Sequence, residues 1–398
     1  MTKLSAENSN SKNILLGISG GISAYKIPFL VRILKKRGHN VKVILTNSAK
    51  KLVATDTLKT LSGFPVYSDD SIDYDMNHIR LNEWADVFVL APATANSIAK
   101  MAHGIADNLL STTFLSLTCP IVVVPAMNTA MLENAATQAN IKKLKNRGII
   151  ALPTAAGELA CGAVGAGRMI EPDDIAEYVT LALQNTDLFG KFAQKTICIA
   201  SGPTVEPIDA VRSITNSSSG KMGAALARAA IFAGAKVVVV SGPASAKLPT
   251  GIELIKVNTA SQMRDAMMKN LPDCDIVVMA AAVGDFRVEN VSSEKISREN
   301  NAQYTINLIK NPDIAKEIGK KKKTEQKLVV FSLETNGGIE RAIQKMSQKN
   351  ADLCVFNDAD DALGKDCSKI TIIRKDEQIF EFDKQSKTVS AAKILELL

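Results

Sequence analysis

The sequence predicts an α/β protein with two doubly wound, mostly parallel sheets of the Rossmann type. Short apolar runs alternate with helical patterns along the chain, which is typical of strands buried on both faces of a parallel sheet. A strand, a glycine-bearing turn and a helix occupy residues 12–37, and the same kind of unit recurs from residue 196. Each half of the chain therefore starts a sheet of its own.

The length supports two domains. At 398 residues the chain exceeds the size at which single cores stop growing, about 250–300 residues. The expected segments are a disordered tail at 1–11, a first domain at 12–187, a linker at 188–195 and a second domain at 196–398.

Composition excludes several classes of protein. No apolar run approaches the roughly 18 residues of a membrane span, so no membrane partner is expected. Residues 1–11 lack the apolar segment of a secretory signal, and we expect a cytoplasmic protein. The six cysteines are scattered without a CxxC pair, which argues against a disulfide framework and a structural zinc site.

The formal net charge of +7 raises the question of nucleic acid as a partner. Part of this charge is the lysine run at 320–323, which is typical of a solvated helix end. No aromatic residues interleave with the basic ones, as a single-strand platform requires. We therefore expect no nucleic-acid partner, and a small anionic substrate would use the positive charge equally well.

The expected strands are the apolar runs. In the first half they lie at 14–18, 41–45, 87–90, 121–124 and 149–152, with a last helix at 172–184 and only one helix expected within 53–80. In the second half they lie at 196–200, 236–240, 252–257, 276–280, 328–333 and 353–356, followed by a hairpin at 370–382 and a terminal helix. Gly38 and Gly148, each after an arginine, are expected to end helices in the left-handed conformation.

Ligands of open α/β sheets bind beyond the carboxyl ends of the strands. In the first half, hydroxyl, amide and small side chains follow the strands, and these suit a phosphate and a flat ring. In the second half a carboxylate, Asp285, occurs near basic residues, as a metal-nucleotide site needs. Neither glycine turn has GxGxxG or Walker spacing, so each alone is compatible with nucleotide binding or with an ordinary tight turn.

Taken together, the motifs of the first half are much more specific. They are GGISAYK at 20–26, His78-Ile79, APATAN at 91–96, PAMN at 125–128, and Ala160-Cys161-Gly162 with Gly167-Arg168-Met169. In this order they closely resemble the flavin-dependent phosphopantothenoylcysteine decarboxylases. The resemblance implies a flavodoxin-like flavoprotein domain.

The second half resembles phosphopantothenate-cysteine ligase. The motifs are SGPT at 201–204, Arg212, Asn216, SSGKMG at 218–223, AAV at 281–283 and NPDI at 311–314. The resemblance covers residues 12–398 in the order of the bacterial bifunctional coenzyme A biosynthesis proteins.

The resemblance implies FMN as the cofactor of the first half and a homo-oligomer with the flavin at a subunit contact. The implied FMN contacts are Ser19, Gly20, Thr46, Ala93, Thr94 and Asn96. Loss of CO₂ from a saturated carbon needs an electron sink, which a flavin supplies by oxidising the substrate thiol. A base, a group that orients the carboxylate and a proton donor complete such a reaction.

Three residues take these roles by motif: His78 as base, Asn128 on the carboxylate and Cys161 as proton donor. Without the family, His78 is compatible with a solvated helix residue, Asn128 with a turn former and Cys161 with packing. Four glycines surround Cys161, at 157, 162, 165 and 167, and this density favours a mobile flap.

For the second half the resemblance implies that CTP activates phosphopantothenate as an acyl-cytidylate, which the amine of cysteine then attacks. Asn216 is implied to hold this intermediate, with Arg212 beside it and Lys295 at the nucleotide phosphates. The remaining implied CTP-site residues are Met279, Ala280, Ala281, Asp285, Pro312, Asp313, Ile314, Ala315, Phe331, Lys345 and Lys349. Magnesium is expected to bridge the phosphates, with Asp285 as its candidate ligand.

The chain departs from the family pattern at two places. Ser297 interrupts the usual Lys-x-Lys-Lys, although Lys295 and Arg298 keep their charge, and Gly284 stands where alanine is common. Two other functions stay open: a flavin-binding sensor that has lost catalysis, and a nicotinamide dehydrogenase. Retention of His78, Asn128 and Cys161 argues against the first, and the missing GxGxxG spacing argues against the second.

Overall fold

The computed structural model describes residues 11–71, 76–159, 162, 164–184, 186–297, 303–334, 338–358 and 367–398. The chain divides into two compact units, one ending at Phe189 and the other beginning at Gly190. Among the described residues, no helix combines the length and the apolar character needed to cross a membrane.

The first unit is built on a six-stranded parallel sheet with the strand order β3-β2-β1-β4-β5-β6. This is the order of a doubly wound Rossmann sheet, and its direction reverses between β1 and β4. The predicted fold class is thereby confirmed for this half. The strands are β1 (Asn13–Ile18), β2 (Asn40–Leu45), β3 (Val66–Tyr67), β4 (Val87–Ala93), β5 (Ile121–Pro125) and β6 (Ile150–Ala151).

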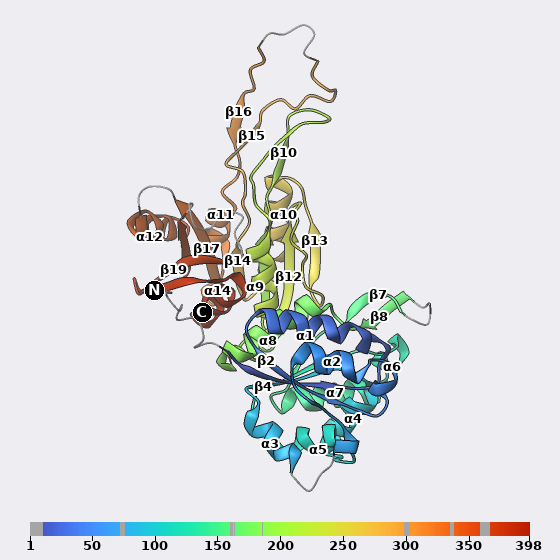
Figure 1. Ribbon diagram of the computed structural model, residues 1–398. Coiled ribbons are helices and arrows are strands. Elements are labelled where there is room, and N and C mark those ends of the chain that lie inside the picture. Colours follow the sequence, from blue (N-terminus) through green and yellow to red (C-terminus); the bar gives the residue numbers. More distant parts are fainter. Residues whose placement is uncertain are drawn as a thin grey trace, which may run out of the picture. The chain divides into compact units, whose positions relative to one another are not determined.

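Helices cover both faces of this sheet. Helix α1 contacts α2 and α8, whereas α4 contacts α5 and α7, and α3 contacts α5. Figure 1 shows α1 and α8 on one side of the sheet and α3 and α5 on the other. The helices are α1 (Ile27–Lys36), α2 (Thr55–Ser62), α3 (Asn77–Trp84), α4 (Ala95–His103), α5 (Leu109–Ser116), α6 (Thr129–Glu133), α7 (Ala135–Asn146) and α8 (Pro172–Gln184), with 3₁₀ turns η1 (Ile22–Lys26), η2 (Ala49–Lys51), η3 (Asp69–Ser71) and η4 (Thr186–Leu188).

The second unit contains an eight-stranded sheet with the order β13-β12-β9-β14-β17-β18-β19-β20. The first six strands in this order are parallel, and β19 and β20 extend them as the expected antiparallel hairpin. The strands are β9 (Thr196–Ser201), β12 (Lys236–Ser241), β13 (Glu253–Lys256), β14 (Ile276–Met279), β17 (Lys327–Glu334), β18 (Leu353–Asp358), β19 (Cys367–Arg374) and β20 (Ile379–Ser386).

Helices again lie in two groups. Helix α9 contacts α14 and the strands β9 and β12. Helix α10 contacts the same two strands, and α11 and α12 contact β17. The helices are α9 (Lys221–Phe232), α10 (Ala260–Asn270), α11 (Ile314–Lys321), α12 (Gly338–Gln348) and α14 (Lys387–Glu396), with a 3₁₀ turn η5 (Leu271–Asp273).

Sequence inspection missed the small ribbons. They are β7 (Ala155–Glu158) with β8 (Val164–Arg168), β10 (Val205–Pro207) with β11 (Ser213–Thr215), and β15 (Phe286–Val288) with β16 (Leu308–Lys310). Strands this short, and largely exposed, carry no readable apolar period. Within 53–80 the structure has one complete helix, α2, as expected, and α3 begins there at Asn77 and continues to Trp84. Each buries too few apolar side chains to show a helical stripe.

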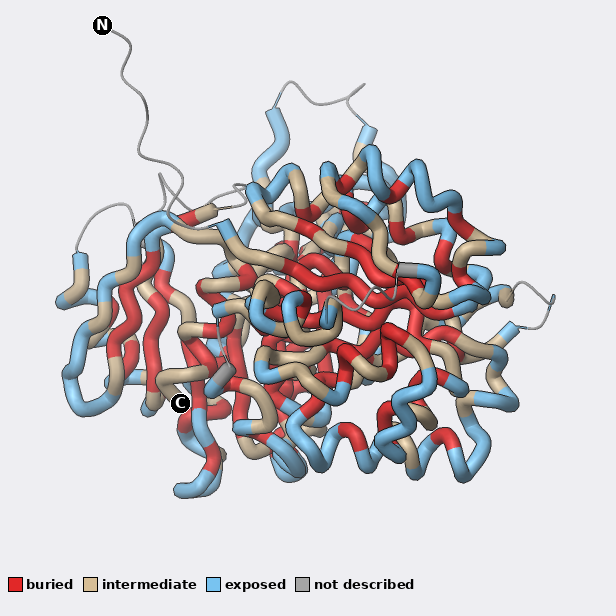
Figure 2. Tube along the Cα trace, turned by 60° about the horizontal axis from the view of Figure 1, so that its bottom comes forward, coloured by how far each residue is buried: buried red, intermediate tan, exposed pale blue. Residues whose placement is uncertain are grey.

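Buried strands form the core of each unit, as the continuous buried stretches in Figure 2 show. In the first unit Phe88 of β4 is fully buried and packs edge-on against Phe114, with ring centroids 6.3 Å apart. Gly38 and Gly148 have φ of 86° and 81°, so both end their helices as predicted.

We predict that Phe88→Ala lowers the free energy of unfolding of the first unit by about 3–5 kcal/mol, because it leaves a cavity in this core. Urea unfolding followed by circular dichroism measures the change. Leu115→Ala is the matched control: Leu115 lies in the same region but its side chain is exposed, and it should change stability by less than about 0.5 kcal/mol. Equal losses in both variants would contradict this description of the core.

Candidate active sites

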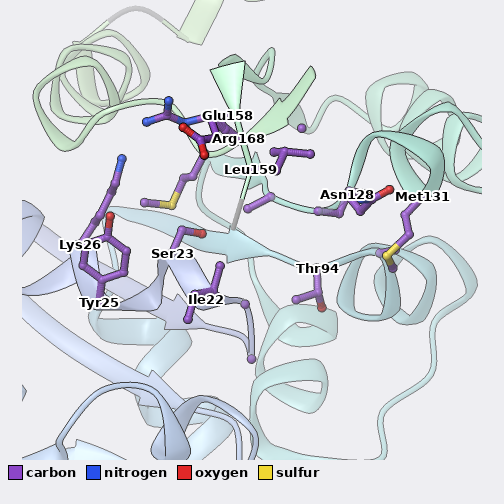
Figure 3. A pocket seen from close by; sticks show the side chains of 17 residues that line it. Ile22, Ser23, Tyr25, Lys26, Thr94, Asn128, Met131, Glu158, Leu159 and Arg168 are labelled. Carbon is purple, nitrogen blue, oxygen red and sulfur yellow. The ribbon is translucent and has the colours of Figure 1, made fainter. Parts of the chain in front are cut away.

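The first unit contains a cavity of about 640 Å³ at the carboxyl ends of β1, β4 and β5. Its walls come from the 20–23 turn, from Thr94 and Asn128, and from Arg168 of β8. Figure 3 shows Tyr25 and Asn128 on opposite sides of this cavity. Most of its wall is apolar, which suits a flat ring.

A second cavity, of about 520 Å³, adjoins the first and has a more polar wall. The two cavities share Gly20, Thr94 and Met131. Five of the six expected FMN contacts line the second cavity: Ser19, Gly20, Thr46, Thr94 and Asn96. The sixth, Ala93, is fully buried at the end of β4 and lines neither cavity.

A chain of hydroxyl groups fixes the wall between these cavities. Ser19 Oγ donates to the carbonyl of Pro92 at 2.7 Å and accepts the N–H of Thr94 at 3.0 Å. Thr94 is in turn the N-cap of α4, where its Oγ1 accepts the Ser97 N–H at 3.3 Å. The N-terminus of α4 therefore points its partial positive charge toward the cavity wall, where an anion would bind favourably.

Gly20 is required by close packing. A Cβ atom at Gly20 would lie 2.3 Å from Cβ of Ser48, in the turn after β2. Any side chain there would push the β1 turn away from the β2 turn. The glycine therefore lets two strand ends form one wall of the polar cavity.

Asn128 lies at the apolar cavity, directly after β5. It is the N-cap of α6, and its Oδ1 accepts the Ala130 N–H at 2.9 Å. The ribbon strand β8 lies against this turn, because the Met127 N–H donates to the carbonyl of Gly167 at 2.9 Å. The side-chain orientation of Asn128 is thus set by its own helix cap and by the β7–β8 ribbon.

The other two predicted catalytic residues are placed differently. His78 is a half-buried residue of α3 and lines neither cavity of its own chain; its carbonyl accepts a hydrogen bond from Ser116 Oγ at 3.2 Å. Cys161 lies outside the described residues, so its predicted position is not tested. Of the three, the described geometry brings only Asn128 to the candidate site.

An ion-pair group that sequence inspection did not single out lies at the apolar cavity. Lys26 Nζ contacts both carboxylate oxygens of Glu171, at 2.7 and 2.9 Å, and Arg168 lies 3.7 Å from the same carboxylate. Lys26 and Arg168 line the cavity. Lys26 lies in the 20–26 motif and Arg168 in the 167–169 motif, and this position was the one indication in the sequence that they belong to the site.

In the second unit, β9 and α9 approach each other closely. A Cβ atom at Gly223 would lie 2.0 Å from Oγ of Ser201, and one at Gly220 would lie 2.7 Å from Cβ of Ala244. Ser201 Oγ is buried and has no hydrogen-bond partner among the described residues. We call this contact between Ser201 and the first turn of α9 the α9 cradle; N–H groups at a helix N-terminus such as this one favour a phosphate group.

The loop after β14 is fixed by three side chains. Asn216 Nδ2 donates to the carbonyl of Ala282 at 3.2 Å, which joins two of the predicted segments. The N–H of Gly284 donates to Thr204 Oγ1 at 2.9 Å, and its carbonyl accepts Asn311 Nδ2 at 2.8 Å.

The structure also places the other predicted nucleotide-site residues. Lys349 Nζ lies 3.4 Å from Asp313, the N-cap of α11. Phe331 directly follows Val330, which pairs with Met279 in the sheet. Ile314 and Ala315 are buried, so only their backbone can face a ligand. Asp285 is exposed, and its carbonyl accepts the Asn311 N–H at 2.9 Å.

The magnesium prediction has no direct support from side-chain clustering. No group of three or more His, Cys, Asp or Glu residues with the geometry of a metal site occurs in the part of the chain that the structure describes. A magnesium ion held mainly by phosphate oxygens and water would need only one such ligand.

Comparison with known proteins agrees with this two-site arrangement. Residues 2–184 match the family model described as Flavoprotein, and residues 192–398 match the one described as DNA/pantothenate metabolism flavoprotein C-terminal domain. The coenzyme A biosynthesis bifunctional protein CoaBC of Vibrio vulnificus (strain YJ016) is 44% identical over 351 residues, which cover 87% of this chain and 86% of the relative. The chain belongs to the family of coenzyme A biosynthesis bifunctional proteins.

Two further members of this coenzyme A biosynthesis family show the same extent of similarity. The Escherichia coli (strain K12) protein is 42% identical over 352 residues, covering 87% of this chain and 86% of the relative. The Bacillus subtilis (strain 168) protein is 41% identical over 394 residues, covering 97% and 96%. The family resemblance inferred from the sequence motifs is thereby confirmed for both halves.

We predict that Gly223→Ala destabilises the second unit by about 1–3 kcal/mol, because the new methyl group overlaps Ser201 Oγ. This reverses the stabilisation that alanine normally brings to a helix. Gly284→Ala is the matched control, since its new Cβ would have no neighbour closer than 3.6 Å, an ordinary contact. Urea unfolding midpoints of the two variants measure the difference, and a stable Gly223→Ala protein would contradict the cradle geometry.

Proposed function

We propose that this chain carries out two successive steps of coenzyme A biosynthesis. The second unit joins 4′-phosphopantothenate to cysteine at the expense of CTP, through an acyl-cytidylate. The first unit then removes CO₂ from the product, phosphopantothenoylcysteine, and releases 4′-phosphopantetheine. The main support is family membership over both halves, together with a glycine-lined cradle at the strand ends of each unit.

FMN fits the paired cavities of the first unit. The polar cavity, with the Ser19, Thr46 and Thr94 hydroxyls near the N-terminus of α4, suits the phosphate and sugar-like chain. The apolar cavity suits the ring, and the shared Gly20 leaves room between the two. When bound, the flavin supplies the electron sink that decarboxylation of a saturated carbon requires.

The residues of the apolar cavity have proposed roles around that ring. The Asn128 amide orients the substrate carboxylate next to the flavin, because its cap position fixes the side chain. Cys161 is proposed to return a proton to the product. Lys26 and Arg168, at the wall of the same cavity, share the Glu171 carboxylate, and the one net positive charge of these three groups is proposed to favour an anionic substrate.

The place of His78 supports an oligomer. His78 lines neither cavity of its own chain, so a base from that position would have to come from another copy. We therefore propose a homo-oligomer in which each flavin lies at a subunit contact and receives His78 from the neighbouring chain.

In the second unit the acyl-cytidylate is proposed to lie against Asn216 and the loop after β14, with Arg212 and Lys295 facing its phosphate. The α9 cradle, Lys345 and Lys349 are proposed to hold the other two phosphates of CTP, which leave as pyrophosphate when the acyl-cytidylate forms. Asp285 is the residue that would hold a magnesium ion there, and the ion would neutralise part of the phosphate charge. A carboxylate alone repels an attacking amine, and the mixed anhydride with cytidylate removes that charge and provides CMP as a leaving group.

The decisive experiment is a coupled assay with the purified full-length protein. With phosphopantothenate, cysteine, CTP and magnesium we expect release of pyrophosphate and CMP, followed by CO₂, and the protein should be yellow with flavin absorbance. A colourless protein that releases no CO₂ from phosphopantothenoylcysteine would contradict the decarboxylase proposal. A yellow protein without CO₂ release would instead indicate a flavin sensor.

The subunit-shared site makes a separate prediction. His78→Ala and Asn128→Ala should each lower the decarboxylation rate on the order of 10²-fold or more, as loss of an acid–base or orienting group does. When the two variants are unfolded and refolded together, about a quarter of the sites should regain both groups from different chains. Recovery of about a quarter of the wild-type decarboxylation rate in the mixture shows that His78 acts across the subunit contact. A mixture that recovers no activity would contradict the shared site. Each variant refolded alone is the control.

A further inference from the structure

The carboxylate of Asp209 joins two segments of the second unit. Its Oδ1 accepts the N–H groups of Val211 and Arg212, at 2.8 and 2.7 Å, and its Oδ2 accepts the N–H of Ile296 at 3.1 Å. The side chain is buried, whereas Arg212 and Lys295 are exposed. Asp209 therefore cannot touch a ligand itself, but it lies behind two residues that can.

The Arg212 side chain makes a second hydrogen bond between the same two segments. Arg212 Nη2 donates to the carbonyl of Ile296 at 2.9 Å, so both backbone groups of Ile296 are held by the 209–212 turn. Four residues earlier, the Ser292 N–H donates to the carbonyl of Ile208 at 3.1 Å. Lys295 is the residue directly before the held position.

A local turn explains only part of this arrangement. Aspartate side chains commonly accept backbone N–H groups two or three residues later, as Asp209 does with Val211 and Arg212. The bond to Ile296 crosses 87 positions of sequence and has no such local reason. Hydrogen bonds hold the pKa of the Asp209 carboxyl below its usual value: the largest effect comes from the Val211 N–H, followed by the N–H groups of Arg212 and Ile296. The carboxylate is therefore charged at neutral pH.

We propose that Asp209 is a positioning residue of the ligase reaction: its carboxylate fixes the Arg212 turn to the segment that carries Lys295, so that both cations face the same acyl-nucleotide phosphate. This inference rests on the proposed function of the second unit. Charge stabilisation of a developing phosphate leaving group depends on donors held in place before the reaction. A carboxylate with two oxygens can accept from both segments at once, and an amide, with one oxygen, cannot.

The test is a double-mutant cycle on the full-length protein. Asp209→Asn should lower ligase kcat on the order of 10²-fold with a smaller change in KM, because transition-state positioning is lost. In a Lys295→Ala background the same change should lower kcat by a clearly smaller factor, on the order of 10-fold, since one of its two targets is gone and Arg212 remains. An equal loss in both backgrounds would overturn the proposal, because it would show a general structural effect.

Glu206→Gln is the matched control. Glu206 is also a buried carboxylate, and its Oε1 accepts the Ala260 N–H at 2.9 Å, but it makes no described contact with the 292–296 segment. It should change stability without a kcat-selective loss. Decarboxylation of phosphopantothenoylcysteine, which uses the other half, should be unchanged in both variants and reports that the first unit is folded, and urea unfolding of each variant reports on the second unit.

Hydrogen exchange separates failure of this inference from failure of the proposed function. In Asp209→Asn the Ile296 amide should exchange at least about 10-fold faster, whether or not the protein has ligase activity. Unchanged exchange at Ile296 would overturn the positioning role even in an active ligase. Should Asp209→Asn not fold, Ile296→Pro removes the same donor from the opposite segment, and the same kcat loss is expected; full activity in that variant would overturn the proposal.

Discussion

Both candidate sites depend on one steric constraint: a strand end and its neighbour approach so closely that only glycine fits between them. At Gly20 the nearest atom to an added Cβ would be 2.3 Å away, and at Gly223 it would be 2.0 Å away. Overlap of that size cannot be relieved without moving backbone. The close approach sets serine and threonine hydroxyls and a helix N-terminus beside the same small volume. That combination binds phosphate groups without a cation in contact.

The two units use this constraint for different ligands. In the first, an apolar cavity adjoins the polar one, which suits a molecule with a flat ring and a phosphate tail. In the second, the proposed site combines the cradle at α9 with the exposed cations Arg212 and Lys295 and with Lys349. A triphosphate carries more charge than one helix terminus can stabilise, so lysine and arginine side chains are needed around it. The chemistry of each half follows from these surroundings, since the sheets themselves are of one type.

The sheets could be predicted from the sequence because their strands are continuous apolar runs, such as Ile14–Ile18. Glycine residues in the turns mark where these runs end. The short ribbons could not be predicted, since three-residue strands such as β10 and β15 have too few positions for a period. For the sites, motif order identified the family, and the structure places Asn128 and five of the six predicted FMN contacts at one cavity pair. The role of Asp209 could not be predicted from the sequence, because its hydrogen-bond partner Ile296 lies 87 positions away in the chain.

We propose that the glycine-lined strand ends of the first unit hold FMN, with its phosphate in the polar cavity and its ring in the apolar one. A crystal structure of the full-length protein with FMN tests this most directly. We predict the phosphate within hydrogen-bonding distance of the Ser19–Thr94 wall and the α4 N-terminus, and the ring beside Asn128. A flavin bound elsewhere, or with its phosphate among the Lys26 and Arg168 side chains, would contradict the account.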